Sequence, residues 1–167
     1  MIPKGELYMR ILVISDTHQN VDSLRRVLLA QPTAEVVIHL GDGEDDVALL
    51  KPSFPDKTFL QVRGNCDFGS NLPYNGTYTA EGVTIFYTHG HLFSVKNGLE
   101  LAMSAAREQE AKVLLFGHTH HALTDYEDGM HIMNPGSAGL GSPSDVLSYG
   151  TLDITPQGIV TNIVKIQ

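Results

Sequence analysis

Residues 10–18 read RILVISDTH, an apolar run that ends in Asp16, Thr17 and His18. A short run this rich in β-branched residues predicts a buried strand over residues 10–15. The side chains that follow directly include a carboxylate and an imidazole, which are common ligands of metal ions. The stretch therefore predicts a strand that carries metal-binding groups at its carboxyl end.

The same arrangement recurs along the chain. The apolar runs VVIHL, FLQVR, TIFYT, VLLF and HIM each lead into a polar cluster. In chain order these clusters contain Asp42; Asn65, Cys66 and Asp67; His89 and His91; His118 and His120; and residues 134–137, NPGS. Ligands of open α/β sheets bind outside the carboxyl ends of the strands. If the strands run in the same direction, all of these clusters meet at one edge.

Strand and helix patterns alternate in the first third of the chain. Strands are predicted at 10–15, 35–40 and 57–62, and helices at 21–30 and 45–51, the second ended by Pro52. After a turn-rich loop at 64–76, hairpins are predicted at 77–88, 122–134 and 148–166, a helix at 98–110 and a strand at 112–116. The order is β-α-β-α-β followed by a meander with one further helix. We therefore expect an α/β fold of two packed mixed sheets flanked by helices.

The composition is that of one globular domain. The chain has 167 residues, 42% of them hydrophobic, and we divide it into an N-terminal leader at 1–8 and a single domain at 9–167. The net charge of −8 argues against a broad nucleic-acid-binding face. No apolar run is long enough to span a bilayer, and the lone Cys66 fits a reducing compartment, so we expect a cytoplasmic protein without membrane contact. Association into a homo-oligomer is left open.

The ligand types indicate which metals the clusters would hold. They are carboxylates, imidazoles and one amide, without a thiolate cluster, which suits a catalytic site for Mn, Fe, Co, Ni or Zn. The candidate ligands are too many for one such ion and sufficient for two. These candidates are Asp16, His18, Asp42, Asn65, His89, His118 and His120.

The motifs D-x-H, G-D, G-N-x-D, H-G-H and G-H-T-H, in this order, resemble those of the calcineurin-like metallophosphoesterases. The closest likeness is to the small single-domain phosphodiesterase branch, in which the third motif reads G-N-C-D, and it spans residues 10 to about 166. The resemblance implies a four-layer αββα sandwich. It also implies that Asp16, His18 and His120 hold a first metal, Asn65, His89 and His118 hold a second, and Asp42 bridges them.

The resemblance implies a metal-dependent phosphoesterase, and a phosphodiesterase in particular, acting on a small phosphorylated substrate. Two divalent ions, Mn favoured with Ni, Co, Fe or Zn as alternatives, would clamp the phosphoryl group and acidify a bridging water. The resulting hydroxide would attack phosphorus in line with the leaving oxygen. The fold also serves as a non-enzymatic scaffold in a eukaryotic membrane-coat complex, so a metal-binding interaction module with little catalysis is the alternative.

Cys66 departs from the wider family, in which many relatives carry a histidine that helps to protonate the leaving group. A thiol has an ordinary pKa of about 8.5 and brings no positive charge. We therefore expect good leaving groups to be favoured, and diesters over monoesters. His91 is a substitute proton donor, and Asp67 a group that orients a ligand or a water.

Ordinary structural roles compete with several of these interpretations. Cys66 is interpreted as a loop residue near the site without a chemical step, and Asp67 as either a cap or a support for the ligands. Residues 134–137 are interpreted as a turn, or as a segment that supports the ligands or lies beside the phosphate. His39 is interpreted as a core histidine, and Arg63 as either a substrate contact or a surface ion pair. The loops at 67–78 and 139–147 would set specificity. Phe68, Tyr74 and Phe93 are candidates for lining such a pocket or for packing in the core.

Overall fold

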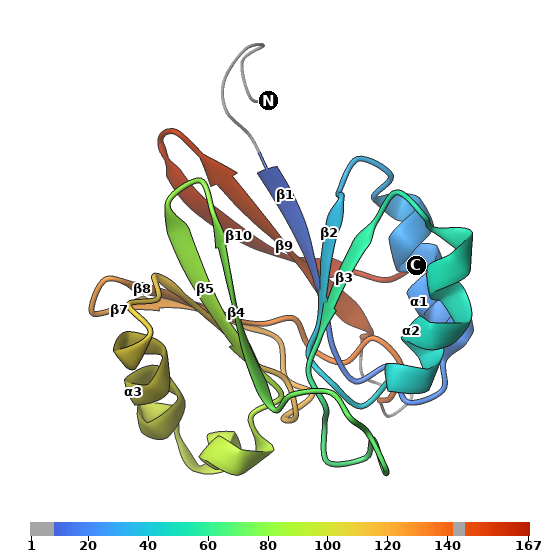
Figure 1. Ribbon diagram of the computed structural model, residues 1–167, viewed down its shortest axis with the longest axis horizontal. Coiled ribbons are helices and arrows are strands. Elements are labelled where there is room, and N and C mark those ends of the chain that lie inside the picture. The colour runs from blue at the N-terminus through green and yellow to red at the C-terminus, as the bar shows by residue number, and fades with distance from the viewer. Residues whose placement is uncertain (1–8, 142–145) are drawn as a thin grey trace.

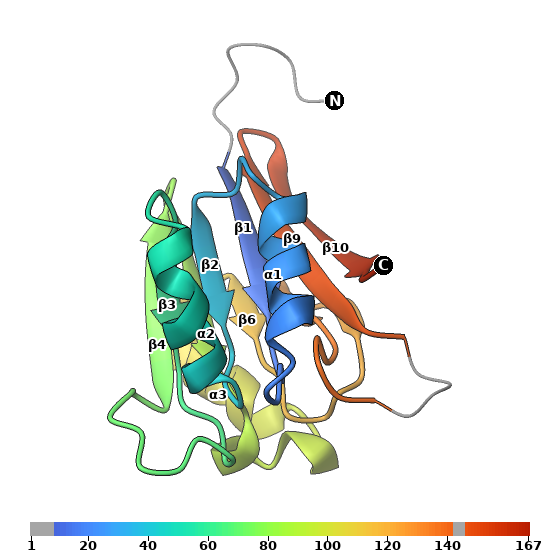
Figure 2. The same cartoon turned by 90° about the vertical axis from the view of Figure 1, so that its right-hand side faces the viewer.

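Two five-stranded sheets pack face to face, with helices on their outer faces (Figure 1). The computed structural model describes residues 9–141 and 146–167, so the expected leader at 1–8 lies outside the described residues. The strand orders are β10-β9-β1-β2-β3 and β4-β5-β6-β8-β7. Helices α1 and α2 cover the first sheet and α3 covers the second (Figures 1 and 2). The predicted four-layer αββα sandwich is confirmed.

The first sheet combines the segment in which strands and helices alternate with the last hairpin of the chain. Its parallel part contains β1 (Met9–Ile14), β2 (Val36–His39) and β3 (Thr58–Gln61), joined by α1 (Val21–Ala30) and α2 (Glu44–Leu50). The hairpin of β9 (Ser148–Thr155) and β10 (Gly158–Lys165) adds to the free edge of β1 in antiparallel fashion. Pro52 lies inside a 3-10 turn, η1 (Lys51–Ser53), that directly follows α2.

The second sheet contains β4 (Asn75–Ala80), β5 (Val83–Thr88), β6 (Val113–Leu115), β7 (Leu123–Glu127) and β8 (Met130–Asn134). Two short 3-10 turns, η2 (His91–Phe93) and η3 (Val95–Asn97), and helix α3 (Glu100–Glu108) connect β5 to β6. The expected meander is wrong here, because β6 pairs in parallel with β8 and not with its chain neighbour β7. Strand β8 is largely buried whereas β7 is exposed along its whole length, so the apolar strand takes the inner position.

Strand β1 is buried on both faces, which explains its unbroken apolar run. Ile11 and Val13 belong to the core cluster between the two sheets, whereas Leu12 and Ile14 belong to the cluster beneath α1 and α2. Successive side chains of a strand point to opposite faces, so β1 serves two cores at once. A third cluster lies between α3 and the second sheet. These interfaces fix the layers whose strand ends carry the site.

Among the described residues, no helix combines the length and the apolar character that crossing a membrane requires.

Candidate metal centre

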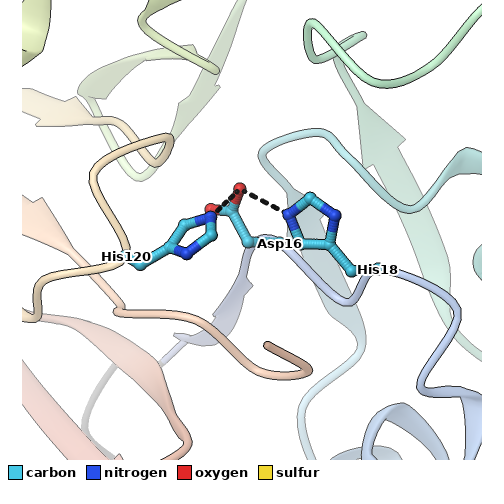
Figure 3. Close-up of side chains that lie close together, drawn as sticks. All are labelled: Asp16, His18 and His120. Atoms are coloured by element: carbon cyan, nitrogen blue, oxygen red, sulfur yellow. Dashed lines mark ion pairs between the residues drawn. The ribbon is translucent and has the colours of Figure 1, made fainter. Parts of the chain in front are cut away.

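The carboxylate of Asp16 lies at the middle of the cluster and is fully buried. Its Oδ2 accepts hydrogen bonds from the Ser15 hydroxyl (2.5 Å) and the His118 main-chain amide (3.2 Å). Its Oδ1 lies 3.3 Å from Nε2 of His120 and 3.5 Å from Nε2 of His18 (Figure 3). The protein thus fixes one oxygen and turns the other toward two imidazoles from different loops.

His89 points its second ring nitrogen at oxygen atoms. Its Nδ1 lies 2.7 Å from the carbonyl oxygen of Leu40, which can only accept, so Nδ1 carries the proton. Its Nε2 then lies 3.3 Å from Oδ2 of Asp42 and 2.9 Å from Oδ1 of Asn65. A neutral imidazole would direct its lone pair at these two oxygens, and either a proton or a metal ion between the atoms removes that repulsion.

The residues fit a pair of cations. Oδ1 of Asp16 and Nε2 of His18 are buried and accept or donate no hydrogen bond among the described residues, although unpaired buried polar atoms are costly. Donor atoms of three sets of side chains lie within 4.8 Å of one another. In the described part of the chain these sets are Asp16, His18 and His120; Asp16, Asp42 and His89; and His18, Asp42 and Cys66.

The remaining predicted residues surround these sets. The ring of His118 lies 5.0 Å from that of His89, and His91 lies 5.3 Å from His89, both between ring centroids. Asn65 reaches the cluster through His89, while Asp42 accepts a hydrogen bond of 2.7 Å from the amide of Cys66. The fold therefore brings every predicted ligand to one edge, although neither His91 nor His118 contributes a donor atom to the three sets.

The ligand-bearing loops adopt backbone conformations that L residues avoid. Ten non-glycine residues among those described have a positive φ, and half of them are predicted metal ligands. Such residues cost about 1–3 kcal/mol each and cluster at functional sites. These ligands are Asp16, His18, Asp42, His118 and His120. These strained positions are thus concentrated in the loops that follow β1, β2 and β6.

Comparisons with known proteins agree with this geometry. Residues 9–157 match the model of the calcineurin-like phosphoesterase superfamily domain. The chain belongs to the calcineurin-like phosphoesterase superfamily.

Individual relatives of this superfamily align over most of the chain. The chain is 32% identical to the probable metallophosphoesterase YsnB of Bacillus subtilis, with 87% of this chain and 85% of YsnB covered. It is 30% identical to phosphodiesterase YfcE of Escherichia coli, over 87% and 88% of the two chains. It is 40% identical to vacuolar protein sorting-associated protein 29 of Schizosaccharomyces pombe, over 81% and 75%.

The fold of the superfamily also appears in a solved structure, that of a predicted phosphoesterase from Streptococcus pneumoniae. It matches with a TM-score of 0.76 and 24% identity over 95% of this chain and 98% of that one.

Asp67 holds two ligand loops together. One carboxylate oxygen accepts hydrogen bonds from the amides of Asp42 and Gly64, both at 2.8 Å. The other accepts from the amides of Gly43 (3.0 Å) and Glu44 (3.1 Å), at the start of α2. Asp67 thus caps the start of α2 and links it to the loop after β3, while its orientation of a ligand or a water stays a prediction. The same loops approach so closely that a Cβ on Gly41 would lie 2.7 Å from the amide nitrogen of Gly64.

Residues outside the motifs support the ligand loops from behind. Asn134 donates hydrogen bonds to the Gly117 carbonyl (3.1 Å) and the Thr119 hydroxyl (2.9 Å), and Ser137 donates to the Asp16 carbonyl (3.0 Å). Sequence reasoning left this segment undecided between a turn and a support, and the contacts show support. His39 is buried, as expected of a core histidine, with its Nε2 3.1 Å from the Thr17 hydroxyl.

The contacts of two residues were not predicted from the sequence. Ser15 binds the Asp16 carboxylate, but a serine at the end of a strand gives no distinctive signal. Arg63 forms no ion pair among the described residues, and its contact with substrate stays a prediction. Its guanidinium donates to the carbonyls of Ser70 (3.0 Å) and Asp67 (3.4 Å) and lies 4.9 Å from the ring centroid of Tyr74.

The electrostatics of the cluster are dominated by its carboxylates. Burial raises the pKa of Asp16, but the ion-pair contacts with His120 and His18 outweigh it and hold that pKa well below its ordinary value. The contact with the Asp16 carboxylate raises the pKa of His18. Burial lowers the pKa of His89, yet the Asp42 carboxylate more than compensates and raises it. Burial, with the charges of His89 and Lys96, lowers the pKa of His118 to about 4.

These directions predict that metal binding releases protons. At pH 6.5 the raised pKa values of His18 and His89 favour protonated imidazoles in the metal-free protein, and a divalent ion must displace those protons. Release should decrease as the pH rises, because both rings then lose their protons before the ion binds. Calorimetric titration with zinc in buffers of different ionisation enthalpy measures it. The exposed His121 gives the control, since His121→Ala should release the same number. Absence of proton release at pH 6.5 contradicts the prediction.

Asp67→Asn should weaken metal binding about 10–100-fold, because groups that orient metal ligands typically contribute that much. An amide keeps the size of the side chain but cannot accept the same four hydrogen bonds with a full negative charge. The measurement is the dissociation constant for zinc or manganese, with the exposed Asp56→Asn as matched control. Unchanged affinity in Asp67→Asn would show that the ligand loops hold their positions without this carboxylate.

Proposed function

We propose that this protein is a metal-dependent phosphodiesterase that carries two divalent transition-metal ions, with manganese as the favoured metal. The observation that carries the proposal is the buried pair Asp16 and Asp42 at the strand ends, with an unpaired oxygen on Asp16 and three imidazoles aimed at the two carboxylates. Membership of the calcineurin-like phosphoesterases supports hydrolysis of a phosphoric ester. The relative YfcE, itself named a phosphodiesterase, supports the diester preference.

The chain's own residues divide into two ligand sets in this proposal. Asp16, His18 and His120 hold one ion, and Asn65, His89 and His118 hold the other, with Asp42 between them. When bound, such ions supply Lewis acidity toward phosphoryl oxygens and lower the pKa of a water molecule. Asp42 is held for this role from both sides, because Asp67 binds its amide while the Cys66 amide binds its Oδ1.

Cys66 and His91 occupy the positions from which a leaving group can be assisted. Burial, and then the Asp42 carboxylate, raises the pKa of the Cys66 thiol, so it is neutral at physiological pH. Burial and the charge of His89 lower the pKa of His91, so this imidazole is neutral too. Neither side chain carries a positive charge to bind a dianion, which favours phosphodiesters over monoesters. His91 Nδ1 is buried without a hydrogen bond among the described residues.

The proposal predicts that activity depends on added metal. Metal-stripped protein should not hydrolyse bis(4-nitrophenyl) phosphate, and Mn, Co, Ni or Zn added singly should restore hydrolysis. Asp42→Asn should lower kcat/KM at least about 100-fold, because loss of the shared carboxylate removes several kcal/mol of transition-state stabilisation. Hydrolysis is followed by release of 4-nitrophenolate. Binding of two metal ions per chain without any ester cleavage would contradict the proposed phosphodiesterase activity and favour a metal-binding interaction module.

Cys66→His should raise activity on alkyl phosphodiesters about tenfold or more, since a positioned general acid contributes about 10²–10⁴-fold to such reactions. Aryl diesters should gain little, because their leaving groups depart without a proton. The measurement is kcat/KM for an alkyl and an aryl diester in parallel, with metal content checked in each preparation. If the metal content is equal and kcat/KM for the alkyl ester does not rise, Cys66 does not determine which leaving groups are preferred.

A scaffold role is the second candidate function. It is favoured by the 40% identity to vacuolar protein sorting-associated protein 29 of S. pombe. The complete set of candidate ligands in this chain supports catalysis over a purely structural role. We further propose a cytoplasmic location, on the bacterial relatives YsnB and YfcE and the lone cysteine.

A further inference from the structure

A cleft of about 490 Å³ opens directly beside the ligand cluster. His18, Asp42 and Cys66 form part of its wall, so a group bound in the cleft would contact the candidate metal ligands. Two apolar side chains, Phe68 and Leu140, line the same cleft. Phe68 is 90% exposed and Leu140 is 48% exposed, although both are large hydrophobic residues. Burial of these two side chains against a bound group would be favourable.

The exposed ring of Phe68 stands on a loop that is extensively hydrogen-bonded. The carboxylate of the preceding residue, Asp67, accepts four main-chain hydrogen bonds. Arg63 donates to the carbonyls of Asp67 and Ser70, on either side of Phe68, and stacks over Tyr74. A loop held in this way loses little conformational freedom when its aromatic side chain binds a ligand. The main chain therefore holds Phe68 beside the cleft before a ligand binds.

Leu140 is fixed in a comparable way on the opposite loop. Its amide donates to the Ser137 hydroxyl (2.9 Å), and that hydroxyl donates to the main-chain carbonyl of Asp16 (3.0 Å). The adjacent Gly139 amide also donates to the Asp16 carbonyl, at 3.1 Å. The main chain at or next to each of the two apolar residues is therefore hydrogen-bonded within or to loops that carry candidate metal ligands.

The charge of the cleft restricts what it can bind. Glu44 and Asp45, at the start of α2, line it together with the two apolar residues, and no lysine or arginine occurs among the described residues of its wall. An anionic group at this position would be repelled by the carboxylates. The cleft thus combines apolar contact surface with negative charge, which suits a flat uncharged ring and disfavours a second phosphate.

We propose that this cleft binds an uncharged aromatic group esterified to the phosphate, and that Phe68 and Leu140 are specificity-determining residues for it. The proposal rests on the phosphodiesterase function and names its substrate class, a phosphodiester with a planar ring on one ester arm. Such a ring can belong to an aryl alcohol or to the base of a nucleoside. Stacking on Phe68 and contact with Leu140 supply the affinity, and the acidic start of α2 excludes esters with further anionic groups.

Binding can be measured directly by the fluorescence of an introduced tryptophan, because the chain has no tryptophan of its own. In zinc-loaded Phe68→Trp, 4-nitrophenylphosphonate should quench fluorescence at lower concentration than it does in Tyr126→Trp, an exposed position on β7. Methylphosphonate should not quench. A carboxyl group in place of the nitro group should weaken binding in Phe68→Trp, and added Glu44→Gln and Asp45→Asn changes should restore it. Equal quenching at the two positions would overturn the proposal.

Kinetics supply the second readout. Phe68→Ala should raise KM for bis(4-nitrophenyl) phosphate about tenfold with little change in kcat, because the lost contact binds the ring without touching phosphorus. Leu140→Ala should act in the same direction. The matched controls are Tyr126→Ala and Leu101→Ala, both exposed and both outside the cleft. Thymidine 5′-(4-nitrophenyl phosphate) in parallel distinguishes a nucleobase from a simple aryl group, according to which KM responds more strongly to Phe68→Ala.

The outcomes separate the two proposals. If the wild-type protein hydrolyses no ester with any metal tried, the proposed phosphodiesterase activity is overturned. The tryptophan titration still tests whether the cleft binds an aromatic group. Hydrolysis with an unchanged KM in Phe68→Ala and Leu140→Ala would overturn the cleft assignment and leave the phosphodiesterase standing.

Discussion

The arrangement of the site depends on the buried carboxylate of Asp16. Burying a carboxylate is costly unless its oxygens are hydrogen-bonded or paired with positive charge. Here one oxygen is held by the Ser15 hydroxyl and the His118 amide, and the other faces His18 and His120 without a hydrogen bond of its own. The amide contact ties the loop after β1 to the loop after β6, so one carboxylate joins the two sheets at the edge where the ligands gather.

A second carboxylate, that of Asp67, joins two loops within the first sheet. It receives four amides from the loops after β2 and β3 and fixes the main chain on either side of Asp42. This arrangement sustains the positive φ at Asp42, which the chain would otherwise avoid. The loop that carries Asp67 also presents Phe68 to the cleft. The proposed metal site and the proposed substrate contact are in this way linked through one short segment.

The difference between the two carboxylates is instructive. Asp16 has an oxygen left for a cation, whereas both oxygens of Asp67 are occupied by main-chain amides. Both follow a predicted strand, and only their places in the motifs led us to expect different roles. The hydrogen bonds that each carboxylate receives in the folded protein give the physical reason, because the four amides bound to Asp67 occupy the lone pairs that a cation would use.

The sequence by itself determined the layers, the helices and the ends of most strands. The unbroken apolar run before Asp16 requires a strand buried on both faces, and the spacing of Leu24, Val27 and Leu28 requires a helix that covers it. The ordered motifs were sufficient to nominate the candidate ligands and the αββα fold. Only the tertiary structure decided that β8, not β7, lies beside β6, since that choice depends on which strand is buried between neighbours. It alone also revealed the hydrogen bonds of Arg63, Ser15 and Leu140, because no pattern of side chains in the sequence indicates which main-chain carbonyls, carboxylates or hydroxyls these residues contact.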